Sequence, residues 1–124
     1  MENDSKIWTT SEEYFEHNRF KAYEKRHPLE LKSCFDNVER IVDKLNEHGK
    51  ISEIKFGFFR HESRGIWRIG QTGLPHAAET RLYVYLYFDG KTIYLLTIGD
   101  KKQQPDDLRR CADNVKRIKE KVKK

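Results

Sequence analysis

The 124-residue sequence has only two cysteines and no long apolar run. A helix that crosses a membrane needs roughly 18 or more consecutive apolar residues, and no stretch of this chain approaches that length. The opening MENDSKIWTT is acidic and polar, unlike a secretory signal. We therefore expect a cytoplasmic protein without membrane contact.

The two cysteines, Cys34 and Cys111, occupy isolated apolar positions in separate segments. Such placement is typical of reduced core thiols and gives little support to a disulfide or a metal site. The five histidines show neither the H-x-x-x-H pattern nor a metal-binding spacing with cysteine. The sequence therefore predicts no metal and no cofactor, so side chains would have to do any chemistry.

The length fits one domain, over residues 1–124, and the chain contains no internal repeat or low-complexity segment. Lysine and arginine number 25 against 20 aspartates and glutamates, which gives a net charge of +5. This basic balance favours anionic partners, and nucleic acid is the first to consider.

The first half of the chain has the patterns of a short strand and two helices. Residues 5–10, SKIWTT, favour a strand, and Thr10 with Glu13 matches a capping box that predicts a helix from there to about residue 25. Over 28–47, apolar side chains recur at helical spacing and predict a second helix: Leu31, Phe35, Val38, Ile41, Val42 and Leu45.

After Gly49 the apolar period changes from 3.6 to 2. Residues 51–59 and 65–70 predict two strands, and residues 79–100 predict a hairpin joined at the Asp-Gly dipeptide 89–90. That dipeptide is typical of a type I′ turn, which has positive φ at both central residues. The first hairpin strand alternates an apolar face with a face of one arginine and three tyrosines: Arg81, Tyr83, Tyr85 and Tyr87.

A last helix is predicted from Pro105, because five apolar residues form one stripe: Leu108, Cys111, Val115, Ile118 and Val122. The order of elements predicts an α+β fold. It consists of a short N-terminal strand, two helices, a four-stranded antiparallel meander and a C-terminal helix. Lys101 and Lys102 fall between the last strand and this helix, where helix amides would help them bind an anion.

This order of elements resembles the RelE/HigB superfamily of bacterial type II toxins, especially the branch that includes phage-derived host-killing proteins. Three segments carry the resemblance: GIWRIG at 65–70, RLYVYLYFDGKTIYLLTIGDKK at 81–102, and QQPDDLRRCADNVKRI at 103–118. The similarity is strong over 65–118 and weak over the first 50 residues. The resemblance implies a RelE-like fold.

The same resemblance implies a toxin that cleaves messenger RNA on translating ribosomes without a metal. It also implies an antitoxin, encoded beside the toxin, that holds it inactive. In such a reaction the 2′-hydroxyl of the RNA attacks the adjacent phosphorus, so the enzyme must orient the backbone and neutralise the developing charge.

Positions that match the family pattern suggest a charge clamp made by Arg68, Arg81, Lys101 and Lys102. Arginine suits this role because its planar fork can bond two phosphate oxygens at once. The alternative for Arg81 is a salt bridge with Glu79 or with a carboxylate on a neighbouring strand.

Four further residues are expected to contact the RNA: Lys55, Arg60, His61 and Arg64. Solvated loop charges are the alternative for the two arginines. The proton donor or acceptor is expected to be His76 or His61, since a histidine near neutral pKa can exchange protons at working pH. The alternative for each histidine is an ordinary exposed side chain.

The tyrosines at 83, 85 and 87 could stack on bases, or they could pack beneath a helix. A different class of protein also fits part of the chain. A strand followed by paired lysines at a helix start resembles the end of a double-stranded RNA-binding domain, which would be a binding module without catalysis. A third alternative is a toxin relative that has lost cleavage.

Overall fold

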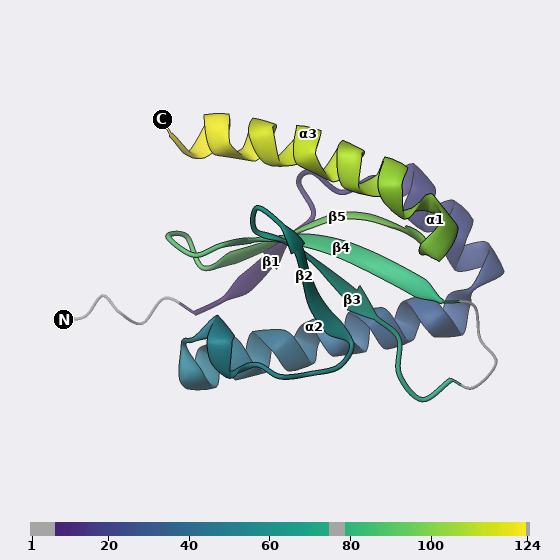
Figure 1. The fold of residues 1–124 in the computed structure, drawn as a ribbon, viewed down its shortest axis with the longest axis horizontal. Helices are drawn as coiled ribbons and strands as arrows, with labels where there is room; N and C mark the ends of the chain where they lie inside the picture. The colour runs from purple at the N-terminus through teal and green to yellow at the C-terminus, as the bar shows by residue number, and fades with distance from the viewer. Residues whose placement is uncertain (1–6, 75–78, 124) are drawn as a thin grey trace.

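The structure is a computed structural model that describes residues 7–74 and 79–123 (Figure 1). In chain order its elements are β1 (Thr9–Ser11), α1 (His17–Arg26), α2 (Pro28–His48), η2 (Ile51–Glu53), β2 (Phe59–Ser63), β3 (Ile66–Gly70), β4 (Thr80–Tyr87), β5 (Thr92–Asp100), η3 (Lys101–Gln103) and α3 (Gln104–Val122). The fold is therefore α+β, as predicted.

One mixed sheet of five strands, in the order β1-β5-β4-β3-β2, forms the centre of the molecule. Strands β2 to β5 are antiparallel neighbours, and β1 adds to β5 in parallel. The predicted four-stranded meander thus accounts for only part of the sheet. The pairing of β1 with β5 is invisible to local sequence patterns because it joins segments that are distant along the chain.

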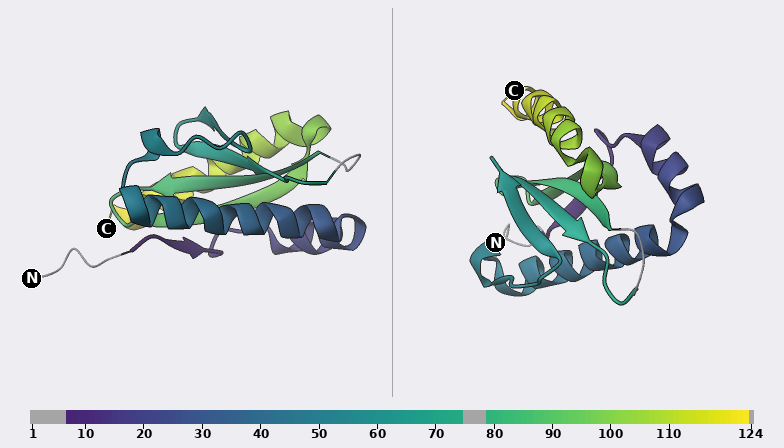
Figure 2. Two further views of the ribbon diagram at one scale, coloured as in Figure 1. Left: turned by 90° about the horizontal axis from the view of Figure 1, so that it is seen from below. Right: turned by 45° about the vertical axis from the view of Figure 1, so that its right-hand side comes forward.

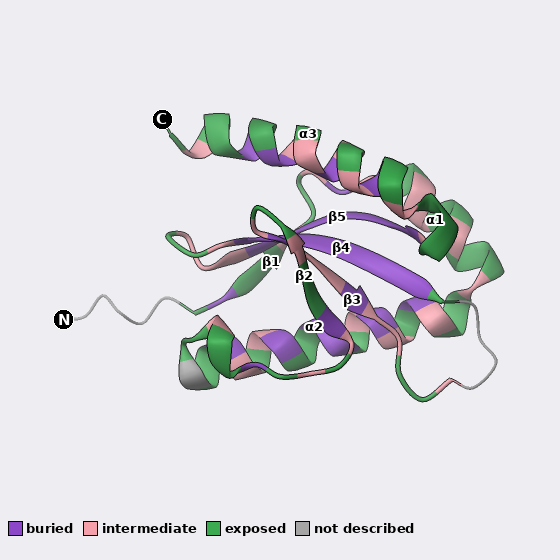
Figure 3. Ribbon diagram, in the orientation of Figure 1, coloured by how far each residue is buried: buried purple, intermediate pink, exposed green. Residues whose placement is uncertain are grey.

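Two helices cover opposite faces of the sheet, with α2 on one side and α3 on the other (Figures 1 and 2). Alternate residues of β4 point to the two sides, so Leu82, Val84 and Leu86 belong to the core next to α2. Tyr83 and Tyr85 belong to the core next to α3. Figure 3 shows the result, since β4 and β5 are buried along most of their length.

The second predicted helix is confirmed, because α2 begins at Pro28 and ends at Gly49, whose φ of 74° is the left-handed conformation that glycine tolerates. The capping box at Thr10 is wrong. Residues 9–11 form β1 instead, and α1 begins only at His17, with no side-chain cap at Glu16. Here pairing with β5 overrides a local helix signal.

One strand prediction also needs correction. Residues 51–59 are not a strand: they contain η2 and a turn, and β2 begins at Phe59. Ile51, Ile54, Phe56 and Phe58 still pack against the core, so apolar alternation there reflects burial without strand pairing.

The hairpin between β4 and β5 is confirmed, but its turn is not of type I′. Within this turn only Lys91 has positive φ, at 48°, so neither Asp89 nor Gly90 has the conformation that type I′ requires. Packing explains the glycine at position 90, because a Cβ there would come within 2.7 Å of the Tyr87 ring. Within residues 7–74 and 79–123, no helix combines the length and apolar character that a membrane span needs.

We expect both thiols to be unreactive in the folded protein. Cys34 and Cys111 are fully buried and form no disulfide. Burial raises the pKa of both thiols, that of Cys34 to about 12. Because the thiolate is the reactive form, a disulfide-exchange reagent should titrate neither thiol until denaturant unfolds the chain. Fast stoichiometric labelling in native buffer would contradict this placement.

Candidate functional site

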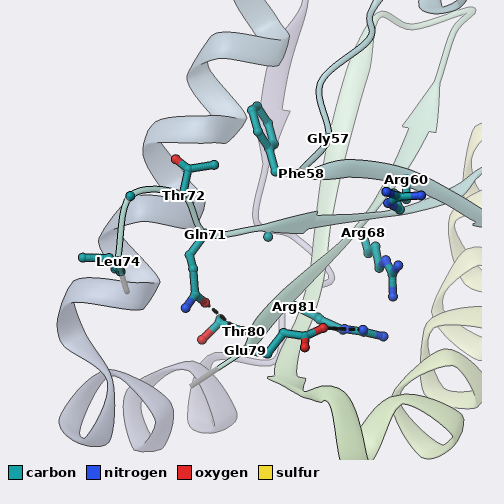
Figure 4. Close-up of a pocket in the computed structure, with 12 residues that line it drawn as sticks. Gly57, Phe58, Arg60, Arg68, Gln71, Thr72, Leu74, Glu79, Thr80 and Arg81 are labelled. Atoms are coloured by element: carbon teal, nitrogen blue, oxygen red, sulfur yellow. Dashed lines mark hydrogen bonds and ion pairs between the residues drawn. The ribbon is translucent and has the colours of Figure 1, made fainter. Parts of the chain in front are cut away.

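A pocket of about 430 Å³ opens at the end of the sheet where β3 stops and β4 begins. It contains three arginines from three neighbouring strands, Arg60 of β2, Arg68 of β3 and Arg81 of β4 (Figure 4). The remaining lining residues are Gly57, Phe58, Gly70, Gln71, Thr72, Gly73, Leu74, Glu79 and Thr80. Two of the three arginines, Arg68 and Arg81, were predicted for the charge clamp.

Strand register brings the arginines together. Arg60 is directly opposite Arg68, and Arg81 lies opposite Gly70 on β3 and Gly99 on β5. Residues paired across a sheet point to the same face, so Arg60 and Arg68 share one side. The two glycines opposite Arg81 have no side chain, and at Gly99 the space that a Cβ would take is filled by the Asp107 carboxylate.

Arg81 is buried, with 8% of its surface exposed, and it forms the salt bridge with Glu79 that the sequence left as an alternative. Its Nε and Nη2 both donate to Glu79 Oε2, at 3.2 and 2.5 Å. This hydrogen bonding lowers the pKa of Glu79, and the charges of Arg81, Lys101 and Arg68 lower it further. Glu79 is therefore stabilised in its charged form at this pocket, chiefly by Arg81.

Arg68 is held by side chains that the sequence analysis missed. Its Nε lies 3.1 Å from Glu62 Oε2, and its Nη1 donates to Gln104 Oε1 at 3.3 Å. Gln104 in turn donates to Glu62 and accepts from the Tyr83 hydroxyl. These partners come from β2, β4 and α3, so only the folded sheet assembles them, and no local pattern could have identified them.

Arg60, Lys101 and Lys102 are exposed and have no ion-pair partner among the described residues. Together with the paired Arg68 and Arg81, they leave an excess of positive charge at this end of the sheet. The described side chains can therefore attract an anion there.

Lys101 and Lys102 lie in η3, directly before α3, and neither lines the pocket. The predicted use of helix amides beside them stays a prediction. The carboxylate of Asp100 already accepts from the Gln103 amide, at 3.1 Å, and two acidic residues occupy the first turn of α3. Both lysines are exposed, and no side chain caps the N-terminus of α3 among the described residues.

The other predicted RNA contacts are dispersed. His61 pairs with Trp67, and its ring lies 5.0 Å from the indole on the sheet face opposite to Arg68. Arg64 occupies the β2–β3 turn with φ of 49°, and Lys55 is exposed before β2; neither lines the pocket. His76 lies outside the described residues.

The tyrosines of β4 pack beneath α3 instead of presenting a stacking surface. Tyr83 has no exposed surface and Tyr85 is 9% exposed, while Tyr87 is partly buried against the same cluster. Burial raises the pKa of Tyr83 and Tyr85. Base stacking by Tyr83 or Tyr85 is therefore wrong, and the packing alternative holds.

A buried carboxylate lies beneath the turn that carries the lysines. Asp107 of α3 is fully buried against Gly99, and its Oδ1 lies 3.0 Å from Arg19 Nη2 and 4.0 Å from Arg110 Nη1. Neither carboxylate oxygen accepts a hydrogen bond of good geometry from the described residues. Arg19 also donates to Gln103, so this contact links α1 to η3 and α3. Burial raises the pKa of Asp107 despite both arginines.

Comparisons with protein-family models, curated proteins and solved structures found no match. Among the described residues, no group of three or more histidine, cysteine, aspartate or glutamate side chains is arranged to hold a metal ion.

We expect the ionised carboxylate of Asp107 to lower the free energy of unfolding. Because its folded-state pKa lies above the ordinary value of 3.8, the folded protein keeps this proton over a pH range in which the unfolded chain has released it. The loss in free energy of unfolding should therefore grow as pH rises from 3.8 to the folded-state pKa, and it should stay constant above that pKa. Denaturant titrations of wild type and Asp107→Asn across this range measure the effect.

Relative to Asp107→Asn, wild type should lose stability as pH rises through that range. Asp106→Asn, which changes an exposed carboxylate on the same turn, serves as the control. If wild type gained relative stability instead, the attraction of Arg19 would outweigh the cost of burial.

Proposed function

We propose that this protein is the toxin of a type II toxin–antitoxin system with a RelE-like fold, and that it cleaves messenger RNA on translating ribosomes without a metal. The observation that carries the proposal is the convergence of Arg60, Arg68 and Arg81 on one pocket, beside the exposed Lys101 and Lys102. The order of strands and helices along the chain also fits such a toxin.

The reaction would use the RNA as its own nucleophile. The 2′-oxygen forms a bond to the adjacent phosphorus, the bond to the 5′-oxygen breaks, and the products are a 2′,3′-cyclic phosphate and a 5′-hydroxyl. The attacking hydroxyl loses a proton and the leaving oxygen gains one. Negative charge accumulates on the phosphoryl oxygens in the transition state, so fixed cations lower the barrier.

The three arginines would stabilise this negative charge in different ways, because each has different neighbours. Arg68 and Arg81 are already oriented by Glu62 and Glu79, so little reorganisation is needed when a phosphate arrives. A phosphate would compete with Glu79 for Arg81, and this carboxylate is exposed enough to swing away. Arg60 is free among the described residues to contact the chain next to the cleaved bond. His76 remains the candidate for proton transfer.

The double-stranded RNA-binding domain is a weaker fit to the observed topology. That fold is expected to have one helix before its sheet, whereas this chain has α1 and α2 between β1 and β2. A toxin relative without cleavage remains the second candidate, because the described part of the pocket contains three arginines and a carboxylate that is already paired with one of them, but no histidine.

We expect expression of the wild-type chain alone to arrest growth and translation, and the double variant Arg81→Lys, Lys102→Ala to relieve this arrest. Lysine cannot reproduce the planar fork of arginine. Loss of such a charge contact should lower the cleavage rate roughly a hundredfold. Lysine is preferred to alanine at position 81 because Arg81 is buried and its truncation would disturb the fold.

A matched control changes exposed residues of α3 in the same way, Arg109→Lys with Lys116→Ala. This control should remain as toxic as wild type. A soluble, folded Arg81→Lys, Lys102→Ala variant that is still fully toxic would refute the charge clamp.

The ends of the cut RNA test the chemistry separately. We expect a 2′,3′-cyclic phosphate and a 5′-hydroxyl, and no cut where the attacking 2′-hydroxyl is replaced by hydrogen, although cationic contacts to phosphate would still allow binding. Translating ribosomes and EDTA-treated naked RNA are assayed separately, since EDTA dismantles ribosomes. A 5′-phosphate product would exclude this mechanism, and binding without cleavage in both assays would favour the inactive relative.

A further inference from the structure

We infer that a groove between β1 and α2 binds a cationic, amphipathic segment of a partner protein. The groove has a volume of about 570 Å³. It exists because α2 packs on β3 and β4 while α1 packs on β5, so the outer part of the sheet next to β1 is left uncovered.

The floor of this groove is apolar. Phe35, Val38 and Val42 lie on α2 at helical spacing, and Leu95 of β5 faces them. Val38 and Leu95 are buried, whereas Phe35 and Val42 are only partly covered. A partner side chain that entered the groove could therefore bury apolar surface, which is the main source of affinity in protein association.

The rim of the groove is acidic. Glu39 and Asp43 are exposed one turn apart on α2, and Glu12 follows β1 on the other side. The carboxylates of Glu39 and Asp43 have no ion-pair or hydrogen-bond partner within the described residues. The carboxylate of Glu12 has one there, His17, at 3.9 Å. Among the described residues that line the groove there is no lysine, arginine or histidine.

The negative charge of the groove rim is opposite in sign to the net charge of the whole chain, which is +5. Unpaired carboxylates around an apolar floor repel nucleic acid and favour a ligand that combines apolar and cationic side chains. The groove also lies far along β5 from the arginine pocket, since β1 pairs with residues 92–94 whereas Arg81 pairs with Gly99. The two sites therefore do not compete.

Exposed apolar side chains extend the surface beyond the groove. Ile7 and Phe88 are 60% and 47% exposed, and the Phe88 ring contacts Trp8 directly before β1. Clustering of exposed apolar residues at one edge of a protein is typical of a protein-binding site. A segment of several residues could thus run along β1, with its lysines or arginines facing Glu39 and Asp43.

The test uses a short synthetic peptide in which leucine alternates with lysine, and a second peptide with glutamate in place of every lysine. Binding to the full chain is followed by amide chemical shifts in an NMR titration. We expect the lysine peptide to move the signals of Thr9, Thr10, Val38 and Val42, and we expect the glutamate peptide not to bind.

Charge reversal by Glu39→Lys with Asp43→Lys should lower the affinity of the protein for the lysine peptide roughly tenfold. The matched control Asp113→Lys with Glu120→Lys, which reverses two exposed carboxylates on α3, should bind as wild type does. Equal binding of both peptides, shifts that map elsewhere, or full affinity after reversal at 39 and 43 would overturn the inference. None of these outcomes depends on RNA cleavage, so the proposed function can fail independently.

Discussion

The burial of β4 on both faces determines where this protein can place its charged groups. From Thr80 to Leu86 every residue of this strand is buried between α2 and α3. Arg81 is the single charged residue in that stretch, and it lies next to the first residue of the strand. Its charge is compensated by Glu79.

Positive and negative side chains therefore gather at different places on the molecule. Cationic side chains lie at the end of the sheet where β3 stops and β4 begins, whereas exposed carboxylates line the groove between β1 and α2. A basic protein with an acidic groove has two surfaces that attract different ligands. If both proposals hold, one chain could retain RNA at the pocket while a second protein occupies the groove.

Periodic segments were predictable from the sequence and long-range contacts were not. The apolar spacing of residues 28–47 gave α2 nearly to its ends, and the stripe at 108, 111, 115, 118 and 122 gave α3. The capping pattern at Thr10 failed because β1 gains more from pairing with β5 than from starting a helix. A strand partner that lies so far along the chain leaves no local signal.

The residues of the candidate site were likewise only partly predictable from the sequence. Arg81 and Arg68 could be identified from the strand pattern and the family resemblance, but Glu62 and Gln104 only from the assembled sheet. His61 follows Arg60 in the same strand, so alternation sends the two side chains to opposite faces. The burial of Asp107 against Gly99 depends on how α3 packs on the sheet, so no local pattern in the sequence indicates it.

The parallel pairing of β1 with β5 has a consequence for how the chain folds. Residues 9–11 can pair only after residues 92–94 have been synthesised, so the edge strand leaves the ribosome long before its partner strand. Pairings between distant segments slow folding, because loop-closure entropy is lost before any contact compensates for it. The meander β2 to β5 can form earlier from neighbouring hairpins, and the addition of β1 would then be the late step that completes the sheet.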